Sequence, residues 1–91
     1  MASLSEVLPK INEALERFND WVMGDLEASL QSIKGDRLVV FIKQVCACSL
    51  DFSIREELEA AFRDAGLRVR IEKVDFDAER VGYVAYCVIE G

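Results

Sequence analysis

Histidine is absent from this 91-residue sequence. Its absence excludes the Ser-His and Cys-His pairs of nucleophilic enzymes and every metal site that uses histidine. The residues that are present form no recognisable catalytic, cofactor-binding or metal-binding motif. We therefore expect a protein that is not an enzyme and that carries no cofactor.

Proline and glycine are scarce, with one proline and five glycines in the whole chain. No linker, low-complexity tract or internal repeat is recognisable, and the length suits one hydrophobic core. Because 52% of the residues are hydrophobic, the chain has enough apolar surface to fold. The sequence therefore predicts a single domain over residues 1–91.

Long hydrophobic runs are missing as well. The longest uncharged stretch, Val81–Ile89, is far shorter than the roughly 20 residues of a membrane-spanning helix. Charged residues such as Glu6 and Lys10 interrupt any secretory signal. The three cysteines are odd in number and not densely spaced, which favours a reducing compartment. We expect a soluble cytoplasmic protein with no membrane association.

Basic residues are in the minority, with 11 lysines and arginines against 17 acidic residues and a formal net charge of -6. This balance disfavours a general phosphate-binding surface. A protein partner that is basic or neutral fits this net negative charge better than a nucleic acid does.

Apolar residues recur at spacings of four and three from Leu4 to Val22, which predicts an amphipathic helix. Gly24 followed by Asp25 combines a helix C-terminal signal with an N-cap. We therefore expect a break or kink there, followed by a second short helix over Asp25–Lys34.

The rest of the chain reads as strand, helix, strand, strand. Leu38–Cys48 is rich in residues that favour β-structure and is predicted to be a strand. A capping box at Ser53 marks the start of a helix, and Gly66 marks its end. Two more strands are predicted over Leu67–Phe76, with a bulge near Lys73, and over Val81–Ile89.

The last strand is apolar on both faces, so it belongs in the middle of the sheet. A right-handed helical crossover makes the first two strands parallel and leaves a gap for the third. The prediction is an α+β fold: an N-terminal helix or kinked helix pair, then β-α-β-β with a three-stranded mixed sheet of order 1-3-2. We expect the helices mainly on one face; a monomer with helices on both faces is the alternative.

A sheet with one uncovered apolar face predicts a partner. The candidate interface residues are Val84, Tyr86 and Val88 on the last strand, with Trp21 and Met23 beside the main apolar seam of the first helix. A homodimer is the default, because two-fold dimers are the commonest assembly. We expect a non-enzymatic interaction module that uses its sheet face or N-terminal helix and presents acidic helical surfaces to a protein partner.

A nucleic-acid-binding module that uses the edge formed by Arg68, Arg70 and Arg80 is one alternative. Acidic residues interleave with these cations, which is also the pattern of a solvated, charge-protected edge strand.

Cys46, Cys48 and Cys87 offer a further alternative, a thiol or metal site on neighbouring strands. Cysteine is commonly buried for packing alone, and a closed tetrahedral site would need a fourth ligand. Simple core packing is therefore the competing interpretation.

Overall fold

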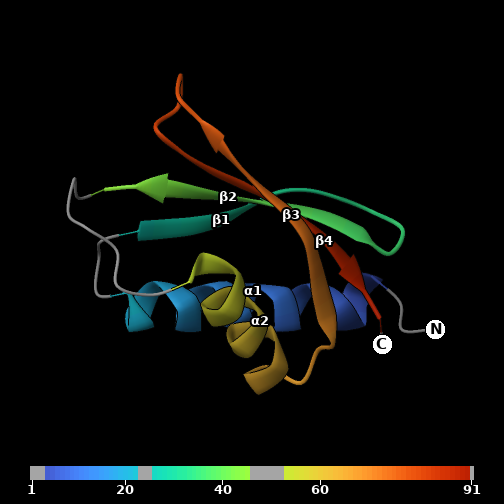
Figure 1. Ribbon diagram of the computed structural model, residues 1–91. Helices are drawn as coiled ribbons and strands as arrows, with labels where there is room; N and C mark the ends of the chain where they lie inside the picture. The colour runs from blue at the N-terminus through green and yellow to red at the C-terminus, as the bar shows by residue number, and fades with distance from the viewer. Residues whose placement is uncertain (1–3, 23–25, 46–52, 91) are drawn as a thin grey trace.

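The computed structural model describes residues 4–22, 26–45 and 53–90, which form two helices and a four-stranded sheet in the order α-β-β-α-β-β (Figure 1). The elements are α1 (Leu4–Trp21), β1 (Leu26–Lys34), β2 (Arg37–Gln44), α2 (Ile54–Asp64), β3 (Val69–Asp77) and β4 (Gly82–Ile89). The α+β class expected from the sequence is confirmed.

The helix predicted over Asp25–Lys34 is wrong, because β1 occupies most of this range. β1 has a bulge between Leu30 and Ser32, where one extra residue shifts the side-chain alternation. Because of the bulge, Leu26, Leu30 and Ile33 belong to one strand although they are spaced four and three residues apart in the sequence. That spacing is the same as in the apolar stripe of a helix. α1 itself ends at Trp21, just before the predicted break.

Two hairpins build the sheet, and Gly35 shapes the first. Gly35 and Asp36 connect the paired residues Lys34 and Arg37, and Gly35 has a φ of 63°. Glycine at the first of two loop residues is typical of the hairpin turns whose twist matches the strands.

The strands lie in the order β1-β2-β4-β3, and every neighbouring pair is antiparallel. The central position of β4 is confirmed, and β2 and β3 run in the same direction on either side of it. The predicted three-stranded mixed sheet is wrong, because β1 adds a fourth strand and takes the edge expected for β2. The predicted bulge near Lys73 is confirmed between Ile71 and Lys73.

The chain consists of two halves of the same design, each a helix followed by a hairpin with a bulged outer strand. Moving β4 to the front of the element order would give β-α-β-β-α-β, the split β-α-β motif. That relation concerns architecture and carries no function by itself.

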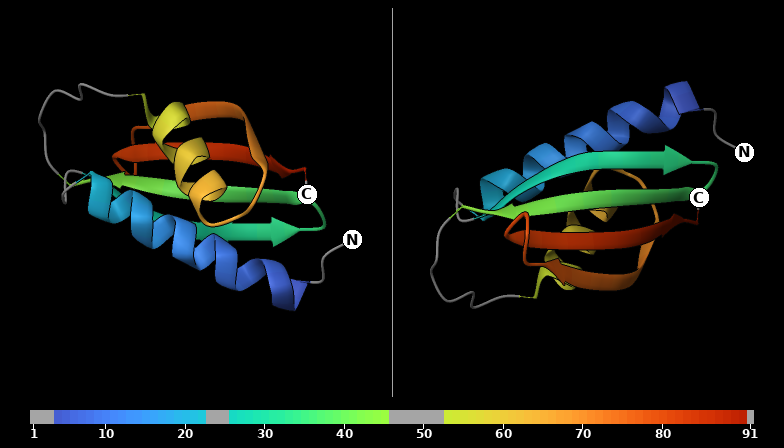
Figure 2. Two further views of the ribbon diagram at one scale, coloured as in Figure 1. Left: turned by 90° about the horizontal axis from the view of Figure 1, so that it is seen from below. Right: turned by 90° about the horizontal axis from the view of Figure 1, so that it is seen from above.

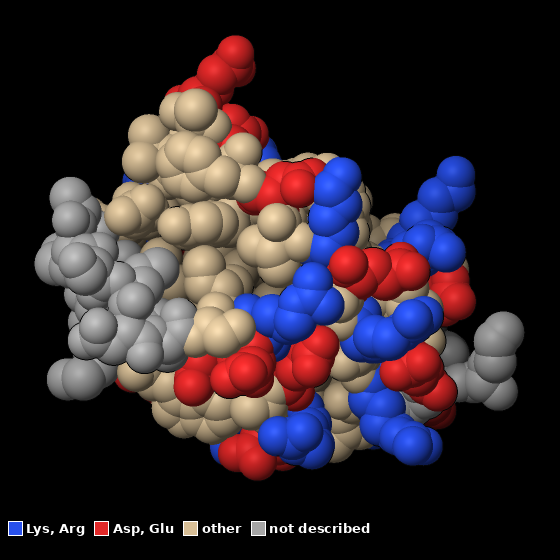
Figure 3. Space-filling model, viewed as in Figure 1, with Lys and Arg blue, Asp and Glu red and all other residues tan. Residues whose placement is uncertain are grey.

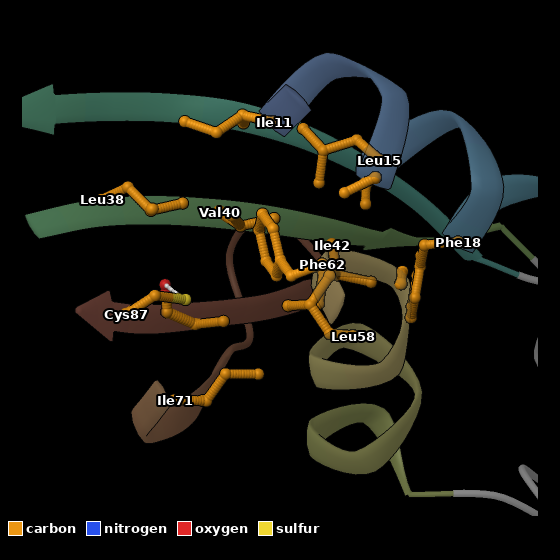
Figure 4. Packing of buried hydrophobic residues seen from close by; sticks show 14 of the residues in the cluster. Ile11, Leu15, Phe18, Leu38, Val40, Ile42, Leu58, Phe62, Ile71 and Cys87 are labelled. Atoms are coloured by element: carbon orange, nitrogen blue, oxygen red, sulfur yellow. Dashed lines mark hydrogen bonds between the residues drawn. The ribbon is translucent and has the colours of Figure 1, made fainter. Parts of the chain in front are cut away.

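Both helices pack on the same face of the sheet, as expected (Figures 1 and 2). Side chains from α1, α2 and the facing side of the strands meet between the layers (Figure 4). The labelled core residues are Ile11, Leu15, Phe18, Leu38, Val40, Ile42, Leu58, Phe62, Ile71 and Cys87. Burial of these apolar side chains supplies the main stabilisation of the fold. The opposite face of the sheet is left without a helical layer (Figure 2).

α2 follows the sequence signals closely. Ser53 is its N-cap and accepts a hydrogen bond from the backbone N–H of Glu56 at 3.4 Å. Gly66 follows the C-cap with a φ of 85°, and the N–H of Leu67 closes the end by donating to the carbonyl of Phe62 at 2.9 Å.

Candidate protein-interaction surface

The face of the sheet opposite the helices, called the open face below, is organised in four rows that cross the strands in the order β1, β2, β4, β3. The pairing gives Glu27-Lys43-Gly82-Asp77, Ser29-Phe41-Val84-Asp75, Ser32-Val39-Tyr86-Lys73 and Lys34-Arg37-Val88-Arg70. Intervening residues such as Leu38, Val40 and Ile42 are buried toward the helices. The two middle rows thus carry an apolar centre between a serine on β1 and a charged residue on β3.

The expected interface residues of β4 lie together on this open face. Tyr86 is 41% exposed, whereas Val84 and Val88 are each 9% exposed. Phe41 and Val39 are their neighbours on β2 and are half-buried. The face therefore presents an aromatic and aliphatic strip that neighbouring side chains partly cover.

Arg80, in the turn after β3, provides part of this cover. Its guanidinium lies 3.9 Å from the centre of the Phe41 ring, close enough for a cation–π contact. It also donates to Asp77 Oδ2 at 3.0 Å and to Gln31 Oε1 at 2.7 Å. Arg80 is therefore held over Phe41 on the open face by three partners.

Lys73 and Arg37 of the open face also have anionic neighbours. Lys73 Nζ lies 3.1 Å from Asp75 Oδ2 and 5.8 Å from the centre of the Tyr86 ring. Arg37 pairs with Glu72 at 3.0 Å. The Asp75 carboxylate raises the pKa of Lys73, chiefly through its hydrogen bond. The positive charge of Arg37 and Lys73 is thus balanced within the chain. Figure 3, which views the molecule from the side of β3 and α2, shows basic and acidic residues interspersed there.

The outer edge of β1 is closed by a side chain of α1. Asn19 Nδ2 donates to the carbonyl of Ala28 at 3.2 Å, and the N–H of Ala28 donates to Asn19 Oδ1 at 2.7 Å. The amide occupies both outward backbone groups of Ala28, as a neighbouring strand would. This contact blocks strand addition at that point of the edge.

The outer edge of β3 is closed in the equivalent way by α2. Arg55 donates to the carbonyl of Ile71 at 2.6 Å, and the N–H of Ile71 donates to Glu59 Oε1 at 3.3 Å. Both edges also carry bulges, which further oppose edge-to-edge pairing. The open face is therefore the less protected surface of the sheet.

The remaining sequence-predicted contact residues lie elsewhere. Trp21 is exposed at the end of α1 and is not part of the open face. Met23 lies outside the described residues.

The three arginines proposed for nucleic acid do not form one cluster. Arg70 lies in the row at the start of β3 and is 3.6 Å from Glu90, whereas Arg80 lies beyond the other end of the nine-residue strand. Arg68 is exposed just before β3. The contiguous edge that this alternative needs is thus not formed by these side chains.

Cys87 is buried on the helical side of β4, where burial raises the pKa of its thiol to about 12. The thiolate that metal binding or redox chemistry requires is therefore disfavoured. Cys46 and Cys48 lie outside the described residues. Within 4–22, 26–45 and 53–90, no group of three potential metal ligands gathers.

Comparisons with protein-family models, curated proteins and solved structures returned no match. Within the described segments, neither helix has the length and apolar character to cross a membrane. Val39 and Phe41 were not among the interface residues predicted from the sequence, although they alternate on an apolar strand. The cover by Arg80 and the edge contacts of Asn19 have no sequence signal, because they depend on tertiary packing.

Proposed function

We propose that this protein is a non-enzymatic protein–protein interaction module that forms a homodimer through its open face. The observation that carries this proposal is the single helical layer: one apolar side of the sheet is covered, and the other has Tyr86 exposed at its centre. Because helix side chains occupy both sheet edges at Ala28 and Ile71, face-to-face packing is favoured over strand addition.

The outward helical layer would then be available to a second protein. The exposed charged residues of α1 include one lysine, Lys10, and four acidic residues, namely Glu6, Glu13, Glu16 and Asp20. In a dimer packed through the sheets, this acidic surface points away from the interface on both sides. A partner with a basic surface is the complement that this charge favours.

A protein partner is favoured over nucleic acid by the local ion pairs. Arg37, Arg70 and Lys73 each lie within 4 Å of a carboxylate of the same chain. Phosphate contacts would have to displace these carboxylates in a protein whose net charge is -6.

The size of the open face sets the expected affinity. Four strands about 4.8 Å apart and about eight residues long cover roughly 500 Å² per subunit. The total, about 1,000 Å², is at the lower limit for a specific interface. We therefore expect a reversible dimer with a dissociation constant in roughly the micromolar range.

Sedimentation equilibrium over a range of protein concentrations tests the proposal. The wild type is expected to pass from monomer to dimer, and Tyr86→Glu is expected to shift this transition to at least about ten-fold higher concentration, since it places a charge at the interface centre. Trp21→Glu is the matched control, because it introduces the same charge at an exposed aromatic residue on α1. A wild type that stays monomeric up to about 1 mM would overturn the proposal.

A further inference from the structure

The charges of the open face are arranged unevenly along the strands. The row nearest the β3–β4 turn carries Glu27, Lys43 and Asp77, and the row beside it carries Asp75. The third row carries Lys73, and the row at the opposite end carries the basic residues Lys34, Arg37 and Arg70. The open face therefore has an acidic end and a basic end.

We propose that two copies pack open face to open face about a two-fold axis that crosses the strands, so that each strand meets its own counterpart running in the opposite direction. This inference rests on the proposed homodimer and specifies its geometry. The rotation exchanges the two ends of the face, so the acidic end of each copy lies over the basic end of the other. A two-fold interface of this kind is self-complementary.

The residue pairs follow from the four rows. Glu27 faces the partner's Lys34 on the β1 side, and Asp77 and Asp75 face the partner's Arg70 and the partner's Lys73 on the β3 side. Each pairing occurs twice by symmetry. Within one subunit, Asp77 already lies 3.0 Å from Arg80, Asp75 lies 3.1 Å from Lys73, and Arg70 lies 3.6 Å from Glu90, so the dimer would share these β3 charges between the two subunits. In the centre, Val84 faces the partner's Tyr86, and Phe41 faces the partner's Val39.

The other two-fold arrangement has its axis parallel to the strands, and the charges oppose it. That rotation places β1 over the partner's β3, and each row lies over the same row of the other subunit. Glu27 then faces the partner's Asp77, and Lys34 faces the partner's Arg70. Like charges meet at both ends, which disfavours this orientation.

Two features of the face need accommodation in the proposed orientation. Lys43 faces the partner's Arg37, but Arg37 is already paired with Glu72 at 3.0 Å, which offsets its charge. Arg80 lies over the Phe41 ring, and the residue opposite is the smaller Val39 of the partner subunit.

Reversal of one charge pair distinguishes the two orientations. Glu27→Lys and Lys34→Glu are each expected to weaken the dimer about three- to ten-fold, because each creates two symmetric like-charge contacts. The double variant is expected to return to within about two-fold of the wild type. Glu16→Lys, an equal change of charge on the exposed side of α1, is the control and leaves the dissociation constant unchanged.

A zero-length carbodiimide cross-link gives an independent readout. Glu27 and Lys34 lie at opposite ends of the same strand, roughly 23 Å apart. A covalent link between their side chains can therefore form only between two subunits, and we expect mass spectrometry to find it in the dimer fraction. The expected link is lost in Glu27→Gln.

These experiments test the orientation of the two subunits separately from the formation of the dimer. A dimer that Glu27→Lys strengthens, or that lacks the Glu27–Lys34 link, overturns this orientation and leaves homodimerisation standing. Absence of any dimer overturns both.

Discussion

At the scale of the residue, the turn between β3 and β4 shows a conflict between two neighbouring positions. Val81 has a φ of 52°, a conformation that disfavours a β-branched side chain, although glycine follows it directly. Gly82 cannot exchange places with it, because a Cβ at Gly82 would lie 2.6 Å from the carbonyl oxygen of Ile42 and 2.7 Å from the ring of Phe41. The tight packing of β4 beside β2 thus fixes the glycine and leaves the strain on Val81.

Cys87 shows how the central position of β4 controls the chemistry of one side chain. Burial raises the pKa of its thiol from 9.0 to about 12, with smaller contributions from the nearby Glu59 and Glu72. In the unfolded chain the thiol would lose its proton near its ordinary value, whereas the folded protein retains it. The contribution of this thiol to folding stability is therefore complete below about pH 9 and is lost as the pH rises toward about 12.

This difference predicts the pH dependence of unfolding. Over that window the wild type is expected to lose up to about 1.4 kcal/mol of unfolding free energy per pH unit relative to Cys87→Ala, which has no thiol at this position. Urea unfolding of both proteins at a series of alkaline pH values measures it. Parallel pH profiles would show that Cys87 is accessible to solvent in the folded state.

At the scale of the element, side chains of the preceding helix form hydrogen bonds with the outer backbone groups of each edge strand. Asn19 of α1 holds Ala28 of β1, and the Arg55 and Glu59 side chains of α2 hold Ile71 of β3. In both halves of the chain, helix side chains thus bind the N–H and the carbonyl of one residue of the edge strand. They also explain why we assign association to the open face and not to an edge.

We predict that Asn19→Ala destabilises the protein by about 1–3 kcal/mol, because the N–H and carbonyl of Ala28 both lose their partner in a part-buried position. Asn12→Ala, an exposed asparagine on the same helix, is the matched control and should change stability by less than about 0.5 kcal/mol. Urea midpoints measure both. Equal midpoints for the two variants would mean that Asn19 contributes nothing to the edge.

The sequence predicted those elements whose signals are local. Ser53 and Gly66 mark the ends of α2, and the apolar strand β4 identifies the centre of the sheet. β1 was missed because its bulge gives the apolar residues a helix-like spacing. The edge contacts of Asn19 and Arg55 join residues that are distant in sequence, so no periodicity or composition indicates them.

At the scale of the whole molecule, the layered architecture separates charge as well as polarity. The helical side carries exposed acidic residues on α1, and the open face combines an apolar centre with an acidic and a basic end. A dimer through the open face would bury the apolar centre and leave two acidic surfaces outside. Because its rim contacts are charged, such a dimer is expected to weaken as the salt concentration rises.

The most direct test of the open face as the association surface is a dilution series followed by two-dimensional amide NMR. We expect the amide signals of Phe41, Val84 and Tyr86 to shift progressively with protein concentration, while those of the exposed face of α1 remain fixed. Spectra that do not change with concentration, or shifts confined to α1, would contradict it.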